Sequence, residues 1–216
     1  MNDTFYFDFI SPYAYVGWHV AQSLAKKHGR QLEPVPVLFA ALLNHHGTKG
    51  PAEVPAKRLY VFKDATRSAA AHALPRLTPP PSHPFSPLLA LRIVSMLDDS
   101  AERARAISAL FAATWAGKGG VEAAAEVERV LSAEGFDGAS LVGAAGSDEA
   151  KARLRKQTEA AIAQGVFGVP TLVVDGEIFW GVDSLVHAEQ RMLGFDAVDG
   201  VDLSRWADLP SSASRR

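Results

Sequence analysis

The chain has 216 residues, of which 48% are hydrophobic and 21% charged, with a formal net charge of −2 and no cysteine. The slightly acidic balance argues against a nucleic-acid binder, which carries a basic surplus or stripe, and no apolar run reaches the roughly 18 residues that span a bilayer. Without cysteine there are no disulfides, thiolate metal ligands or cysteine nucleophile, so any sulfur chemistry must come from a bound small molecule.

The first forty residues predict a strand, a helix and a second strand. The aromatic run Phe5–Ile10 is typical of a short buried strand. A helix is expected to start at Ser11 and Pro12, because serine is a favoured N-cap and proline suits the first helical position, and to end at Gly29. The second strand is predicted over Glu33–Phe39, whose two prolines indicate an edge strand or an irregular start.

The middle of the chain predicts helices and loops, and strands return near the C-terminus. From Ala40 to about Ala145 apolar residues recur at helical spacing between proline- and glycine-rich loops, and a further helix ends near Gly165. Two short strands, Thr171–Val174 and Ile178–Trp180, flank an Asp-Gly turn of the kind that closes a hairpin. A last helix is expected to begin near residue 183, and the tail from residue 204 is expected to be loose.

This order predicts an α/β protein with the thioredoxin-like arrangement, β-α-β and later α-β-β-α, interrupted by an all-helical insert. We expect a discontinuous thioredoxin-like domain over residues 1–39 and 165–200, a helical insert domain over residues 40–164, and a C-terminal tail over residues 201–216. Distant parts of the chain would then complete one sheet.

Ser11 is the first candidate for a functional role. It lies where a strand gives way to a helix, and the unsatisfied N–H groups and the dipole of a helix N-terminus stabilise an anion. A thiolate is such an anion, and a serine hydroxyl can donate a hydrogen bond to sulfur. The alternative is that Ser11 only caps the helix.

Val169, Pro170 and Asp183 are the next candidates. An X-Pro bond before a tight turn is a place for a cis bond, which would leave the backbone of Val169 open to an extended peptide ligand; the alternative is an ordinary trans edge proline. Asp183 either caps the last helix or receives the ammonium group of an amino-acid-like ligand. A sulfur site, a backbone edge and a carboxylate together fit glutathione.

Four motifs, in this order along the chain, resemble those of the 2-hydroxychromene-2-carboxylate isomerase family: Phe7–Tyr15, Pro51–Arg58, Phe85–Arg92 and Gly168–Asp183. That family is close to the kappa-class glutathione transferases and belongs to the DsbA-like thioredoxin group. The resemblance runs from about residue 4 to residue 190. It implies a glutathione-dependent cis–trans isomerase that converts 2-hydroxychromene-2-carboxylate to trans-o-hydroxybenzylidenepyruvate, with glutathione supplying the nucleophile.

The resemblance also implies a set of glutathione contacts. Ser11 would face the glutathione sulfur and Lys57 would contact the cofactor. Val169, beside Pro170, would pair with the cysteinyl backbone, and Asp183 would hold the γ-glutamyl end.

Further cofactor contacts are expected from Thr48, Val182 and Ser184, although this chain departs from the family pattern nearby. Thr48 and Ser86 stand where family members often have asparagine, and Ser184 stands where they often have arginine. These departures bear on the substrate more than on glutathione, because a threonine hydroxyl still donates or accepts one hydrogen bond.

The substrate expected from the resemblance is a flat aromatic anion. Lys49, Lys57 or Arg58 could hold its carboxylate, and Phe39 and Trp180 could face its ring. Plain core packing of the two aromatic side chains and simple solvation of Lys49 and Arg58 are the alternatives.

Two other functions are kept open. One is a kappa-class-like transferase that conjugates glutathione to electrophiles, and the other is a non-catalytic binding module on the same fold. The adjacent His45 and His46 are interpreted as exposed loop residues, so no metal is expected. The resemblance implies a homodimer. The start of the chain, Met1 to Thr4, has no basic stretch, so we expect no secretory signal and a cytoplasmic location.

Overall fold

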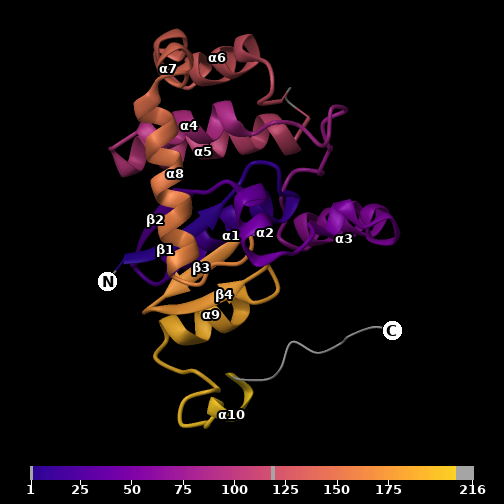
Figure 1. Cartoon of the computed structure of the whole chain (residues 1–216), viewed down its shortest axis with the longest axis vertical. Coiled ribbons are helices and arrows are strands. Elements are labelled where there is room, and N and C mark those ends of the chain that lie inside the picture. The colour runs from indigo at the N-terminus through magenta and orange to yellow at the C-terminus, as the bar shows by residue number, and fades with distance from the viewer. Residues whose placement is uncertain (1, 118–119, 208–216) are drawn as a thin grey trace.

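Four strands form one mixed sheet at the centre of the molecule (Figure 1). The computed structural model describes residues 2–117 and 120–207. The strands are β1 (Asn2–Phe7), β2 (Gln31–Pro36), β3 (Thr171–Val174) and β4 (Glu177–Trp180), in the order β2-β1-β3-β4. β1 is parallel to β2 and antiparallel to β3, and β3 is antiparallel to β4. Strands from the first forty residues and from residues 171–180 therefore share one sheet, as the sequence predicted.

Helices surround the sheet and fill the segment between β2 and β3. Their bounds are α1 (Pro12–Lys27), α2 (Phe39–His46), the 3-10 helix η1 (Pro51–Glu53), α3 (Pro55–Ala71), α4 (Leu88–Met96), α5 (Ser100–Trp115), α6 (Ala124–Ala133), α7 (Gly138–Ala144), α8 (Asp148–Ala163), α9 (Leu185–Met192) and α10 (Ser204–Ala207). The long helix α8 returns from α6 and α7 to the sheet, and α3 projects from the body (Figure 1). The α/β fold with a helical insertion is confirmed, while the domain boundaries stay a prediction.

Several element boundaries differ from the prediction. β1 ends at Phe7 and not at Ile10, because Asp8 turns the chain by accepting hydrogen bonds through its carboxylate. Phe39 does not end a strand; it is the first residue of α2. The loop assignment of His45 and His46 was wrong as well, since both lie in the last turn of α2.

The hairpin turn and the position of β2 agree with the prediction, whereas the start of the C-terminal tail does not. Asp175 and Gly176 have φ values of +50° and +85°, as the predicted hairpin turn requires, and β2 lies at the edge of the sheet as expected. The segment Ser204–Ala207 is helical and not loose. The rest of the predicted tail, residues 208–216, lies outside the described residues.

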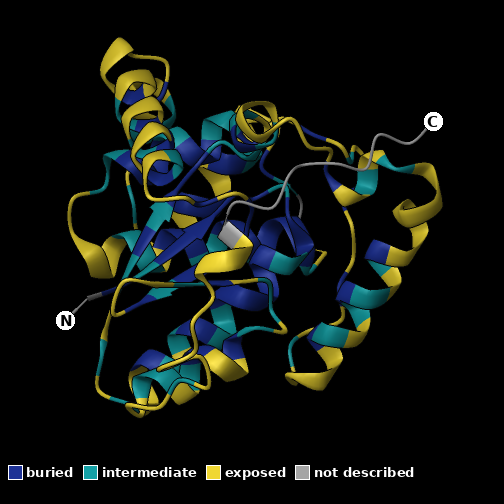
Figure 2. Cartoon of the chain, turned by 60° about the horizontal axis from the view of Figure 1, so that its bottom comes forward, coloured by how far each residue is buried: buried dark blue, intermediate teal, exposed yellow. Residues whose placement is uncertain are grey.

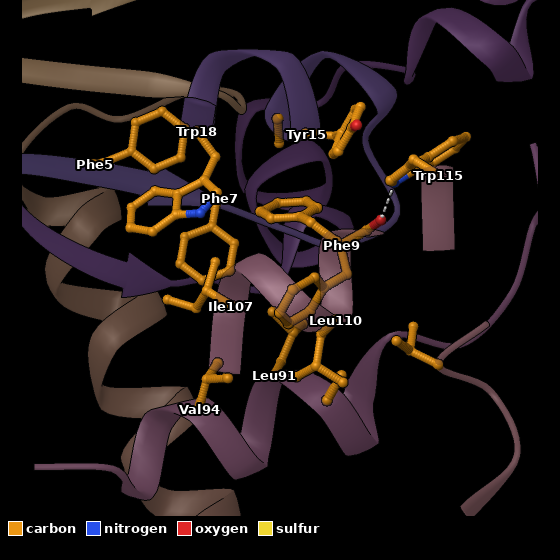
Figure 3. Packing of buried hydrophobic residues seen from close by; sticks show 14 of the residues in the cluster. Phe5, Phe7, Phe9, Tyr15, Trp18, Leu91, Val94, Ile107, Leu110 and Trp115 are labelled. Carbon is orange, nitrogen blue, oxygen red and sulfur yellow. Dashed lines mark hydrogen bonds between the residues drawn. The ribbon is translucent and has the colours of Figure 1, made fainter. Parts of the chain in front are cut away.

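One aromatic cluster joins the sheet to the helices of the insert. Phe5, Phe7 and Phe9 are fully buried and pack on Trp18 of α1 and Phe111 of α5 (Figure 3). The ring centroids of Phe9 and Phe111 are 4.8 Å apart. Each such side chain contributes roughly 1.5–3 kcal/mol when buried. The turn that follows β1 is thus anchored on a core that both parts of the chain supply, and many of the exposed residues lie on outer helical faces and in loops (Figure 2).

Candidate active site

Ser11 lies at the N-terminus of α1 and caps it. Its Oγ accepts a hydrogen bond of 3.1 Å from the backbone N–H of Ala14, and Pro12 follows in the first turn. The capping interpretation is therefore confirmed, but it does not use the hydroxyl proton, which can still be donated. The first turn of α1 contains no acidic residue, so the positive end of the helix dipole is not offset within that turn. Ser11 is 8% exposed.

Asp8, three residues earlier, fixes the turn that leads to Ser11. Its carboxylate accepts hydrogen bonds from the backbone N–H groups of Ile10 (3.0 Å) and Phe39 (2.9 Å), and its backbone carbonyl accepts one from the N–H of Ser11. The side chain is 1% exposed. Burial raises the pKa of Asp8 to about 7, and the two backbone hydrogen bonds oppose this shift only in part.

Two side chains from the helical insert reach the same turn. Trp115, at the end of α5, donates from its indole Nε1 to the carbonyl of Phe9 at 2.9 Å (Figure 3). His83 lies beside the carbonyl of Ile10 and packs edge-on against the ring of Phe62. Burial lowers the pKa of His83, so its imidazole is neutral near pH 7. The insert therefore helps to hold the Asp8–Ser11 turn.

The Val169–Pro170 peptide bond is cis. The carbonyl of Pro170 accepts from the N–H of Gly181 at 2.9 Å, and the hydroxyl of Thr171 donates to the carbonyl of Gly168. Within the described part of the chain, neither the N–H nor the C=O of Val169 has a hydrogen-bond partner. The backbone at Val169 is therefore open to pairing with an added strand.

Helix α1 packs closely against Pro170. A Cβ placed on Gly17 would lie 3.0 Å from the proline ring, so glycine permits this approach. On the other side, a Cβ on Gly168 would lie 2.5 Å from the indole nitrogen of Trp180. Trp180 also packs on Phe167, with ring centroids 5.2 Å apart, and remains 51% exposed. Trp180 therefore borders the proline loop and is not a core residue.

Asp183 does not cap the last helix, so that alternative was wrong. The N-cap of α9 is Ser184, whose hydroxyl donates to the carbonyl of Gly181 at 2.9 Å. Asp183 is exposed, and its carboxylate has no hydrogen bond or ion pair to any described residue. Its charge contributes to the raised pKa of Tyr13 in the first turn of α1, for which burial and Asp64 are larger causes. Asp183 and the start of α1 therefore lie near each other.

A cavity of about 520 Å³ adjoins Asp183. It lies between α1 and α9, with Val182 and Asp183 on its wall and His19 and Glu189 further along. Ser11 and Val169 do not line it. Burial lowers the pKa of His19. Of the predicted cofactor contacts, only Val182 and Asp183 share this cavity.

The predicted contacts of the α2–α3 segment are exposed. Thr48 and Lys49 follow α2, and Lys57 and Arg58 lie in the first turns of α3. Arg58 donates through Nε to the carbonyl of Ala52, whereas no described residue accepts a hydrogen bond from the side chain of Lys49 or Lys57.

Phe39 is half-buried and packs with the small apolar cluster beneath α2 and α8, as the core-packing alternative expects.

Sequence reasoning missed Asp8, His83 and the bond between Tyr13 and Asp64. The hydroxyl of Tyr13 donates to the Asp64 carboxylate at 2.9 Å and so joins α1 to α3, the helix that carries Lys57. A charged residue inside the aromatic run Phe5–Ile10 was the one available signal, because a buried carboxylate needs partners. Among the described residues no group of His, Asp and Glu is placed to hold a metal, and no helix there could cross a membrane.

Comparison with known proteins places this geometry among related folds. Residues 4–192 match the DSBA-like thioredoxin domain. The 2-hydroxychromene-2-carboxylate isomerase of Sphingobium xenophagum is 32% identical over 88% of this chain and 96% of its own length. The glutathione S-transferase kappa 2 of Caenorhabditis elegans is 31% identical over 80% of each chain. A solved 2-hydroxychromene-2-carboxylate isomerase structure superposes with a TM-score of 0.82 at 27% identity, covering 90% of this chain and 95% of the other.

Proposed function

The chain belongs to the DSBA-like thioredoxin domain family and, within it, to the 2-hydroxychromene-2-carboxylate isomerases, and we propose that it is a glutathione-dependent isomerase of 2-hydroxychromene-2-carboxylate-type substrates. The product would be of the trans-o-hydroxybenzylidenepyruvate type. One structural observation carries the glutathione part of the proposal. The backbone of Val169, which has no hydrogen-bond partner among the described residues, lies in the loop that packs on α1, and Ser11 is the N-cap of that helix.

The residues present fit glutathione in its three parts. The unpaired N–H and C=O of Val169 suit the cysteinyl backbone of an extended tripeptide. Ser11, at the amino end of α1, suits its sulfur. Asp183 is an exposed carboxylate without a partner among the described residues, and it suits the γ-glutamyl ammonium group. Val182 and Ser184 flank Asp183 and complete that end.

Ser11 and the helix N-terminus hold the reactive sulfur as an anion. The hydroxyl of Ser11 donates to sulfur while its oxygen keeps the bond from Ala14. The dipole of α1 lowers the pKa of a thiol at this position, and no acid in the first turn opposes it. Glutathione, when bound, supplies a thiolate that adds reversibly to the conjugated substrate and so permits rotation about a former double bond.

The exposed segment from Thr48 to Arg58 supplies the remaining contacts. Lys57 and Thr48 contact the cofactor, and the charge of Lys49 or Arg58 attracts the substrate carboxylate. Trp180 borders the proline loop with half its surface exposed, which suits a flat ring. Phe39 is the second aromatic side chain that we expect to face the substrate ring.

The test is an assay with 2-hydroxychromene-2-carboxylate at fixed enzyme and varied glutathione. Isomerisation should require glutathione and leave its concentration unchanged. A second incubation with a chlorodinitrobenzene-type acceptor separates the isomerase from a kappa-class-like transferase, which the similarity to the Caenorhabditis elegans protein favours as the second candidate. Net glutathione loss with the acceptor, together with no isomerisation of the chromene substrate, would support the transferase. Isomerisation at full rate without glutathione would refute the cofactor.

Oligomeric state and location complete the proposal. We expect a homodimer, which sedimentation equilibrium would test. The exposed Leu59 and Tyr60 on the projecting helix α3, at 65% and 59% exposure, are available to a second copy. A cytoplasmic location is consistent with a cofactor drawn from the cytosolic glutathione pool.

A further inference from the structure

A second cavity, of about 360 Å³, lies between α2, α4 and α8. Its apolar lining includes Leu38 beside α2, Leu88 at the start of α4, and Leu154 and Ile162 on α8. The volume is at the lower end of the range for small-molecule sites, roughly 300–1,000 Å³. None of Ser11, Val169 and Asp183 lines it. The proposed glutathione site therefore does not account for this cavity.

Cationic side chains line the cavity from two helices. Arg92 comes from α4, and Lys151 and Arg155 come from α8; Glu159 is the one acidic residue among the lining residues. Lys151 forms an ion pair of 3.0 Å with Asp148. The cavity therefore carries a positive surplus on a chain whose formal net charge is −2.

Arg92 and Arg155 both lack partners. Within residues 2–117 and 120–207, no acceptor bonds to either guanidinium group and no carboxylate pairs with it. The Nε of Arg92 is buried as well as unpaired. Only Nε of this guanidinium group is enclosed, so its two terminal nitrogens are accessible and free to donate to an acceptor from outside the chain.

We propose that this cavity is a binding site for a small organic carboxylate with an aromatic or aliphatic body. The planar guanidinium fork of Arg92 suits a carboxylate, which it can bind through two parallel hydrogen bonds, and Arg155 adds a second charge from the facing helix. The leucine and isoleucine side chains take the apolar body. The site binds without glutathione, so it stands or falls separately from the proposed function.

The cavity is also linked to the turn before Ser11. The backbone N–H of Leu38, which lines the cavity, donates to the hydroxyl of Thr158 on α8, and the next N–H, that of Phe39, donates to the carboxylate of Asp8. A ligand between α2 and α8 thus lies one residue away from the hydrogen bond that fixes the Asp8–Ser11 turn.

The test measures binding of 1-naphthoate to the full chain by isothermal titration calorimetry, with no glutathione present. Two further ligands each lack one half of the recognised chemistry: 1-naphthamide keeps the rings without the charge, and acetate keeps the charge without the rings. We expect saturable naphthoate binding and at least about tenfold weaker binding of the other two. Absence of saturable naphthoate binding, or equally tight binding of 1-naphthamide, would overturn the proposal.

Variants locate the site. Arg92→Gln and Arg155→Gln should each weaken naphthoate binding about tenfold, whereas Ser11→Ala should leave it unchanged. The matched control is Arg153→Gln, on the same helix as Arg155 but paired with Asp98 and Glu149. If Arg92→Gln does not fold, naphthoate binding is measured on Arg92→Lys and on Arg155→Gln, whose arginine is exposed. Wild-type affinity in the Arg155 variant, or an equal loss in the Arg153 variant, would contradict a site in this cavity.

Discussion

Two regions of the candidate active site are built in opposite ways. The turn from Asp8 to Ser11 is buried, and its backbone is held by the Asp8 carboxylate, the indole of Trp115 and the cap of α1. The segment from Thr48 to Arg58 is mostly exposed, and its lysines have no side-chain hydrogen bond to any described residue. Both regions are expected to contact the same cofactor.

We infer from this difference in burial that the Asp8–Ser11 turn positions the reactive atom, whereas the Thr48–Arg58 segment contributes to ligand binding. A sulfur anion at the start of α1 meets donors that folding has already oriented, so no reorganisation is needed when charge develops. A lysine on an exposed helix must give up side-chain freedom to make its contact, which offsets much of its Coulomb energy. Changes in the buried turn should therefore have large effects on stability and rate, and changes in the exposed segment small effects on affinity.

The largest effect is expected from Asp8, through the pH dependence of stability. Burial raises the pKa of Asp8 to about 7 in the folded chain, whereas the carboxyl of an unfolded Asp has a pKa of about 4. The folded state therefore binds this proton more tightly, and the resulting stability is present below pH 4 and is lost as the pH rises to 7. The slope should reach about 1.4 kcal/mol per pH unit within that window.

Urea denaturation of the wild type and of Asp8→Asn between pH 4 and 8 measures this slope. Other groups, including His19 and His83 with their lowered pKa values, contribute to both curves. The difference between the two curves isolates Asp8, because the asparagine side chain does not titrate. Parallel curves would show that Asp8 titrates alike in the folded and unfolded chains.

Ser11→Ala should reduce turnover about a hundredfold, the loss typical of one preorganised donor to a developing anion. It should also raise the pKa of the bound glutathione thiol, which the ultraviolet absorbance of the thiolate reports. The variant loses an N-cap and with it about 1 kcal/mol of stability.

Ser147→Ala is the matched control for that loss. Ser147 caps α8 in the same way, accepting from the N–H of Ala150 at 3.2 Å, and it lies in the helical insert away from the turn. Both variants should lose similar stability, and only the Ser11 variant should lose rate. Equal rates in the two variants would leave Ser11 with a capping role alone.

The sequence predicted the local part of this site because the relevant signals lie within a few residues. Ser11 followed by Pro12 specifies a helix start, and the cis bond at Pro170 is one of the two alternatives that the X-Pro pattern beside a strand offers. The Asp-Gly turn fixed the hairpin in the same way. Each of these features depends on backbone preferences of neighbouring residues.

The long-range part of the site could not be predicted. One of the two N–H groups that donate to the Asp8 carboxylate belongs to Phe39, 31 residues further on, and the indole that donates to the carbonyl of Phe9 belongs to Trp115, 106 residues away. Periodicity placed Asp8 inside a strand because its neighbours are aromatic. The alternative that Asp183 caps the last helix is wrong, because Ser184 is the N-cap of α9 and the Asp183 carboxylate does not take part in the cap. Tertiary contacts decide such cases.

Asp183 lies between the two extremes, since it is exposed but fixed at the head of α9. A Cβ on Gly181 would lie 2.5 Å from its Oδ1, so the carboxylate lies close against the backbone of Gly181. Asp183→Ala should weaken glutathione affinity about tenfold, as expected for a lost charged hydrogen bond, with little change in turnover at saturation. Isothermal titration with glutathione measures this, and Glu134→Gln at the far end of the insert is the control. Undiminished affinity would remove Asp183 from the cofactor site.

The smallest effect is expected from Lys57. Its ammonium group is exposed on α3, so its contact with a bound cofactor is screened by water and opposed by side-chain entropy. Lys57→Met keeps the apolar stem and should raise KM for glutathione only about twofold to fivefold, an effect that should shrink further at high salt. Lys63→Met, an exposed lysine on the same helix, should leave KM unchanged. A loss of catalytic efficiency in the Lys57 variant as large as that in Ser11→Ala would mean that α3 closes over the ligand and buries this charge. The contrast between a buried turn and an exposed binding segment would then no longer hold.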